Sequence, residues 1–202
     1  MEDPPTDETL ALSERAAAGD RAAVEALLER HLPGLRAYVR LRAGPLVRAR
    51  ESHSDLVQSV CREVIEHIDR FRHPSESAFR QWLYTTAMRK IQHRRDYYLA
   101  DKRDPQKEVA PAPAQASSED VRLLACYRKF SSPSGHAMLK EETERIERAF
   151  DRLPEEYREV ITLARLVGLS RAEIAAQLGK SEGAVKMLLH RALVQMSGLL
   201  EA

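Results

Sequence analysis

Four side chains near the C-terminus could together bind nucleic acid. Lys186, Met187, His190 and Arg191 recur at the spacing of one helical face. Lysine, arginine and histidine can donate hydrogen bonds to phosphates or base edges, and a methionine can pack against a thymine methyl group. Few of these side chains specify a base strongly, so we expect phosphate positioning and DNA shape to carry much of the recognition.

The helix that must position these residues is expected to begin at Ser181, itself a candidate DNA contact. Apolar residues recur on the other side of this segment: Val185, Leu188, Leu189, Ala192, Leu193 and Met196. The pattern predicts an amphipathic helix whose polar face could enter a DNA major groove.

A shorter helix is predicted directly before it. Ser170 and Glu173 have the spacing of a capping box, in which each side chain bonds the backbone N–H of the other residue. Gly179 tolerates positive φ and can end this helix tightly. The two segments predict a helix-turn-helix over residues 169–193, with Ser170 and Arg171 as candidate phosphate contacts. Capping alone also explains Ser170, and an ordinary helical hairpin remains the alternative to a DNA-binding motif.

Composition limits the class of protein. The 202 residues suit one domain or two small ones, and 43% hydrophobic, 31% charged and 5% aromatic residues favour a helical, water-soluble chain. Cys61 and Cys126 lie far apart without ligand spacing, so neither a zinc site nor a disulfide framework is indicated, and no metal or cofactor is expected. No apolar signal core or run of ~18 apolar residues appears, so we expect a cytoplasmic protein without membrane insertion.

Charges alternate in blocks along the chain. Residues 35–50 and 80–103 are basic, residues 51–69 and 141–159 are acidic, and the formal net charge is only +1. The small net charge excludes a uniformly basic coat. The segregation would suit a protein that binds DNA on one surface and a basic protein on another. Ordinary charge mixing on helices is the alternative.

Helical periodicity divides the chain into two blocks. Apolar residues recur at helical spacing over residues 8–99, which are predicted to form a helical bundle interrupted at Pro33-Gly34. Residues 100–139 lose this periodicity and collect prolines, which predicts a flexible linker. Residues 140–202 form the second block. The fold class expected is therefore all-α: two small helical domains joined by a linker, the second containing the helix-turn-helix.

Three passages of the chain occur in a specific order and spacing. They are DLVQSVCREVIEHIDRFR at residues 55–72, FRQWLYTTAMRK at 79–90 and LPEEYREVITLARLVGLSRAEIAAQLGKSEGAVKMLLHRAL at 153–193. Together they resemble the bacterial RNA polymerase sigma factors of the extracytoplasmic-function (ECF) type. The third passage is shared with other transcription regulators, whereas the three in one short chain make a specific pattern.

The resemblance implies a binding role for each passage. The first would dock on the clamp helices of the polymerase β′ subunit, through Asp55, Gln58, Ser59 and Glu63. The loop before the second passage and the helix after it would bind the −10 element, through Phe71, Arg72, His73, Ser75, Ser77, Arg89, Gln92 and His93. The third would bind the −35 element, through Ser170, Arg171, Ser181, Lys186, Met187, His190 and Arg191. A loop with small polar groups can read an unstacked base in a way that a regular helix cannot.

The chain departs from the family pattern at three of these positions and at Cys61. Ser59 replaces the usual Glu, Cys61 a large aromatic residue, Arg89 an Asn and His93 an Asp. The last two change the expected −10 preference, although their positive charge still suits a phosphate backbone. Trp82 lies on the apolar stripe of its helix, which favours a core position over a role in melting the DNA strands.

The function implied is binding rather than catalysis: the chain would give promoter specificity to core RNA polymerase. The expected partners are the β′ and β subunits of core polymerase, promoter DNA and, as a further candidate, an anti-sigma factor. No catalytic triad, metal cluster or phosphate-binding glycine loop supports an enzyme. The alternatives are a free-standing helix-turn-helix regulator and a helical adaptor without a DNA role. The motifs at 55–58 and 79–83 favour the sigma factor, since a plain regulator has no reason to contain them.

Overall fold

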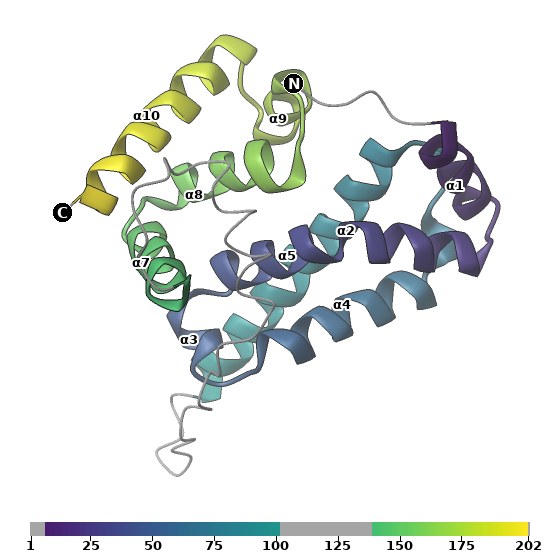
Figure 1. Cartoon of the computed structure of the whole chain (residues 1–202), viewed down its shortest axis with the longest axis horizontal. Helices are drawn as coiled ribbons and strands as arrows, with labels where there is room; N and C mark the ends of the chain where they lie inside the picture. Colours follow the sequence, from purple (N-terminus) through teal and green to yellow (C-terminus); the bar gives the residue numbers. More distant parts are fainter. Residues whose placement is uncertain (1–6, 102–138, 202) are drawn as a thin grey trace.

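The computed structural model describes residues 7–101 and 139–201 of the chain. Within these residues every regular element is helical, which confirms the all-α fold class (Figure 1). The predicted linker lies mostly outside the described residues, at 102–138. The elements are α1 (Asp7–Ala17), α2 (Arg21–Arg42), α3 (Gly44–Arg48), α4 (His53–Glu66), η1 (Ile68–Arg70), α5 (Glu76–Asp101), α7 (Leu139–Asp151), α8 (Glu155–Thr162), η2 (Leu163–Val167), α9 (Arg171–Leu178) and α10 (Glu182–Glu201).

The helices form two groups that lie against each other (Figure 1). In the first group, α2, α4 and α5 pack on one another, and α1 covers α2. In the second group, α10 packs on α7, α8 and α9. The groups touch where α2 meets α7 and where α2 and α5 meet η2.

The helix α2 runs without a break through Pro33 and Gly34, so the expected interruption there is wrong. Asp20 starts the helix, because its carboxylate accepts hydrogen bonds from the backbone N–H groups of Ala22 and Ala23 at 2.9 and 3.3 Å. Gly34 lies in the helix interior, where an added Cβ would come within 2.6 Å of the Tyr84 hydroxyl of α5. The glycine therefore allows close packing of α2 against α5 and does not form a turn.

Aromatic side chains close one end of the first group. The Phe71 and Trp82 rings stack with their centroids 5.6 Å apart, and Phe79 meets the edge of each. Phe79 is fully buried and Phe71 is 3% exposed. Phe71 ends the short turn η1, so its burial fixes the start of the loop that leads into α5. Trp82 is partly buried and packs against this core, as its place on the apolar stripe predicts.

The second group contains the predicted helix-turn-helix. A π-helical turn, η2, continues α8 and ends at Gly168, which has a φ of +73°. The capping box is formed as expected: the backbone N–H of Glu173 donates to the Ser170 hydroxyl at 3.2 Å, and that of Ser170 donates to the Glu173 carboxylate at 2.7 Å. Gly179 ends α9 with a φ of +63°, as its sequence position predicted.

None of the helices in residues 7–101 and 139–201 combines the length and hydropathy needed to cross a membrane. The same residues contain no group of three or more His, Cys, Asp or Glu side chains arranged to bind a metal ion.

Substitution of Phe79 by alanine is expected to lower the free energy of unfolding by about 3–5 kcal/mol, because it removes a fully buried ring from the aromatic cluster. Urea unfolding followed by circular dichroism measures this. Tyr97 is the matched control, since its ring lies on the same helix and is 55% exposed. Tyr97→Ala should change the stability by no more than about 0.5 kcal/mol. Equal losses for both variants would contradict the assignment of this cluster as the core.

Candidate nucleic-acid interface

The polar face predicted for the last helix is present and exposed on α10. Lys186, Met187, His190 and Arg191 are all exposed, and Met187 retains 50% of its accessible surface although it is apolar. Val185, Ala192 and Met196 are buried on the other side, against the rest of the second group. Ser181 starts the helix, because its hydroxyl accepts a hydrogen bond from the backbone N–H of Ala184 at 3.2 Å.

The start of α9 presents Arg171 to solvent, whereas the Ser170 hydroxyl is used by the capping box. Glu173 also accepts a hydrogen bond from the Ser77 hydroxyl of the first group. Burial raises the pKa of the Glu173 carboxyl, but the bonds from Ser77 and Ser170 outweigh that effect and the pKa lies below its usual value. One ionised carboxylate thus joins the helix-turn-helix to the loop before α5.

In the loop before α5, some of the side chains predicted to bind DNA are exposed to solvent, and others are bonded or buried within the protein. Arg72, His73 and Ser75 are exposed, and the Ser75 hydroxyl caps α5 by accepting from the backbone N–H of Ala78 at 3.2 Å. Phe71 is buried in the aromatic cluster and Ser77 is bonded to Glu173. In this conformation Phe71 positions the loop, and the segment from Arg72 to Ser75 faces solvent.

A basic hollow lies further along α5, where this helix meets Glu63 of α4. It has a volume of about 360 Å³ and is lined by Glu63, Arg89, Lys90, His93 and Arg94. Arg89 and His93 were predicted as −10 contacts, and Lys90 and Arg94 were not. The signal in the sequence was the four-residue spacing of Arg89 with His93 and of Lys90 with Arg94, which brings the two members of each pair to the same side of a helix. Four cationic or titratable side chains around a hollow suit a phosphate group.

Glu63 has partners within the chain as well as a predicted role in polymerase docking. Its carboxylate is bonded to Arg89 and lies 2.8 Å from the Lys90 ammonium nitrogen. Burial raises the pKa of Glu63, but the hydrogen bonds and charges of Lys90 and Arg89 together lower it below its usual value. Of the other predicted docking residues on α4, Asp55 and Gln58 are exposed and Ser59 is partly buried.

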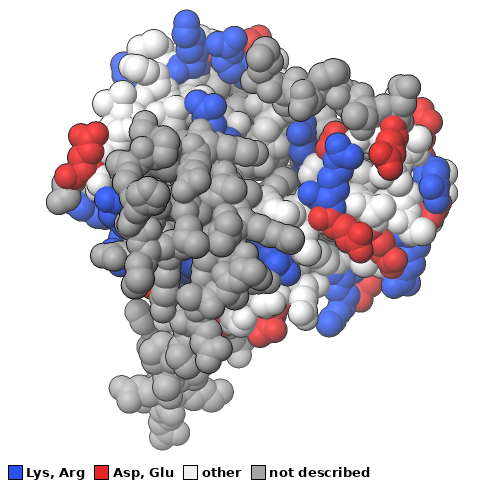
Figure 2. Space-filling view, viewed as in Figure 1, with Lys and Arg blue, Asp and Glu red and all other residues white. Residues whose placement is uncertain are grey.

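Basic and acidic side chains are interspersed on the surface. Figure 2 shows lysine and arginine next to aspartate and glutamate over the described part of one face, in place of a continuous basic coat. The basic groups on the described residues are therefore local, as on the α10 face and in the hollow lined by α5.

Comparisons with known proteins agree with this arrangement. The family model "Sigma-70 region 2" matches residues 27–98, and "Sigma-70, region 4" matches residues 143–196. The chain is 31% identical to the ECF RNA polymerase sigma factor SigD of Mycobacterium tuberculosis over 181 residues, which cover 90% of this chain and 78% of SigD. The chain belongs to the ECF sigma factors. It is also 30% identical to the sigma factor ShbA of Streptomyces griseus over the full length of both chains.

A solved structure shows that the relationship extends to the fold of the sigma factor. The structure of CnrH in complex with the cytosolic domain of CnrY matches with a TM-score of 0.60 and 26% sequence identity, covering 96% of this chain and 98% of CnrH. The first helix group contains the match to region 2, and the second contains the match to region 4. The sigma factor directs core RNA polymerase to promoter DNA and is an initiation factor, not an enzyme. The free-standing regulator is thereby disfavoured.

Replacement of Glu63 by glutamine is expected to destabilise this sigma factor in a pH-dependent manner. Since the folded-state pKa of Glu63 is lowered, its ionised form stabilises the fold above the ordinary pKa of 4.5. This contribution is lost as the pH falls through the lower, folded-state pKa. The difference in unfolding free energy between wild type and Glu63→Gln should thus be present at about pH 7 and shrink as the pH is lowered further and further below 4.5.

Urea unfolding at a series of pH values measures the effect. Glu66→Gln is the control, because Glu66 is exposed one turn further along α4. A difference for Glu63→Gln that stays constant across this pH range would show that the pairing with Lys90 and Arg89 does not depend on the carboxylate charge.

Proposed function

We propose that the two helix groups of this sigma factor divide promoter recognition between them. The helix α4 binds the β′ clamp helices of core polymerase through Asp55, Gln58 and Ser59. The loop at 71–78 and the adjoining face of α5 bind the −10 element, and α10 binds the −35 element. The second group also contacts the β subunit.

One observation carries this proposal: two exposed polar surfaces of different character lie on separate helix groups. On α4 a carboxylate and an amide, Asp55 and Gln58, are exposed opposite a buried apolar stripe, where a basic protein surface can reach them. On α10 the exposed face carries Lys186, His190 and Arg191, which suit DNA. Separate surfaces for a protein and for DNA are what a specificity factor for polymerase needs.

The −10 contacts are proposed on two surfaces, the loop before α5 and a later part of α5 itself. Arg72, His73 and Ser75 are exposed on the loop, and Ser77 becomes available once Glu173 releases it. Arg89, Gln92 and His93 are exposed on α5. To these we add Lys90 and Arg94, whose place in the basic hollow suits a backbone phosphate of the −10 strand.

An anti-sigma factor is proposed as a third partner. CnrH was solved in complex with the cytosolic domain of CnrY, and the present chain is similar to CnrH over nearly its whole length. This similarity supports regulation by a protein that binds the sigma factor directly.

The combined substitution Asp55→Ala and Gln58→Ala is expected to weaken binding to purified core polymerase about tenfold or more, since it removes a charge-assisted hydrogen bond and an amide contact. Fluorescence anisotropy of labelled sigma factor measures the affinity. Glu14→Ala removes an exposed carboxylate from α1 and should leave the affinity unchanged. Wild-type affinity for the double variant would refute the docking role of α4.

Lys186→Ala and Arg191→Ala are each expected to weaken binding of holoenzyme to promoter DNA containing the −35 element. If each side chain contacts a phosphate, each loss should reduce the slope of log affinity against log salt by about one. Arg148→Ala is the charge-matched control, since this arginine is 66% exposed on α7 of the same helix group. An unchanged slope for both α10 variants would place the −35 contacts on another surface.

A further inference from the structure

A cavity of about 170 Å³ lies between α2 and α5 of the first helix group and α8, η2 and α9 of the second. Part of its wall consists of side chains that are at most 6% exposed: Tyr38, Tyr84, Leu163, Val167 and Leu169. Three amide side chains of the wall are exposed: Gln81, Gln92 and Gln177. An apolar cavity with a few polar groups at its edge is the usual form of a small-molecule site.

The volume of the cavity limits the size of a ligand. An apolar cavity of about 150 Å³ is large enough for benzene, whereas drug-sized ligands occupy pockets of about 300 Å³ or more. The cavity therefore suits a molecule that has one ring, or an aliphatic group of similar size, and one polar group.

A carboxylate in the wall of the cavity has no partner within the described chain. The charged side chains of the wall are those of Arg89 and Glu159, and Arg89 is bonded to Glu63. Across residues 7–101 and 139–201, no hydrogen bond or ion pair involves the carboxylate of Glu159, which is partly buried. The uncompensated charge in the wall is therefore negative.

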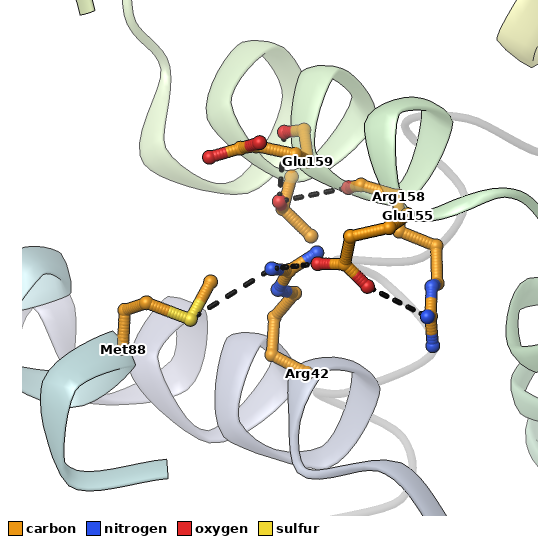
Figure 3. A network of polar contacts seen from close by, with 6 residues as sticks. Arg42, Met88, Glu155, Arg158 and Glu159 are labelled. Carbon is orange, nitrogen blue, oxygen red and sulfur yellow. Dashed lines mark hydrogen bonds and ion pairs between the residues drawn. The ribbon is translucent and has the colours of Figure 1, made fainter. Parts of the chain in front are cut away.

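Two arginines close to Glu159 are bonded to Glu155 instead (Figure 3). Arg42 Nη2 lies 2.5 Å from Glu155 Oε1 and 3.7 Å from the sulfur of Met88. Arg158 Nη2 lies 2.6 Å from Glu155 Oε2. The side chain of Glu159 turns away from the Arg42 guanidinium. Glu155 thus pairs with both cations, and Glu159 is left without one.

The surroundings of Glu159 strengthen its attraction for a cation. Burial raises the pKa of the Tyr38 phenol to about 12, and the charges of Glu159 and Glu155 add to this effect against that of Arg42. The phenol is therefore neutral near pH 7. A carboxylate beside a buried, neutral aromatic side chain is screened less than one in open solvent, so its attraction for a cation is stronger.

We propose that this cavity binds a small organic cation, whose amidinium, guanidinium or ammonium group pairs with Glu159 and whose apolar part lies against Val167 and Leu169. A planar amidinium or guanidinium can donate two parallel hydrogen bonds to one carboxylate. The exposed amides of the wall can donate or accept further hydrogen bonds. The site belongs to the sigma factor itself and does not depend on the DNA and polymerase contacts proposed above.

Benzamidine is the probe, because it combines a benzene ring with an amidinium group. Titration of the full chain, followed by NMR of the backbone amides, should give saturable shifts at Thr85, Val167 and Gln177, with a Kd of about 0.1–1 mM. Benzamide is neutral and has nearly the same shape. It should bind about tenfold more weakly, since it lacks the charge-assisted pair. Equal affinities for the two molecules would refute the role of charge at this site.

Three variants of the full chain locate the site. Glu159→Gln removes the charge with little change of size, so it should weaken benzamidine binding about tenfold and leave benzamide binding unchanged. Glu182→Gln is the matched control, because Glu182 is exposed on α10 of the same helix group, and it should change neither affinity. Thr85→Phe places a ring at an exposed edge of the cavity and should weaken the binding of both molecules. Circular dichroism checks that each variant is folded.

Three results would overturn the site. The first is benzamidine binding to Glu159→Gln as tightly as to the wild type. The second is a set of shifts that lies away from the cavity, which would indicate adsorption elsewhere on the surface. The third is the lack of saturation up to about 10 mM benzamidine, ten times the weakest expected Kd, which would leave the cavity as a hydrated gap between helices.

Discussion

The apolar stripe along α5 is the constraint on which the arrangement of this protein depends. Phe79, Leu83, Ala87 and Ile91 recur every four residues and are buried. The helices α1, α2, α3 and α4 all contact α5, and η2 of the second group contacts it as well. Because one face of α5 is fixed in the core, its remaining faces present the basic hollow to solvent and Tyr84 to the second group. The orientation of a single helix thereby determines both the proposed −10 surface and the contact between the groups.

Features that depend on neighbouring residues could be predicted from the sequence. The capping box at Ser170 and Glu173, the glycine end of α9 and the polar face of α10 each lie within a few residues of chain, so local spacing was sufficient. The three passages that indicated an ECF sigma factor are likewise local, and the matches to regions 2 and 4 confirm them.

Features that depend on distant residues could not be predicted in this way. The local sequence predicts an interruption of α2 at Pro33-Gly34. The glycine is instead needed for close packing against Tyr84, which lies fifty residues away in the sequence and so gives no local signal. Glu63 is predicted as a polymerase contact from the family resemblance, and that prediction does not include its pairing with Arg89 and Lys90 of another helix. For the basic block at 35–50 and the acidic block at 141–159, the sequence leaves open whether they form separate binding surfaces or reflect ordinary charge mixing on helices. The structure joins them to each other, at sequence separations above one hundred residues.

The close approach at Gly34 has a consequence for the genetics of this sigma factor. The Tyr84 hydroxyl, which a side chain at position 34 would displace, also lies 3.5 Å from the backbone carbonyl oxygen of Leu166 in the second group. Any mutation of this glycine therefore disturbs a junction of three segments rather than one helix. Such a mutation would change how the first helix group packs against the second, although it touches neither of the proposed DNA surfaces.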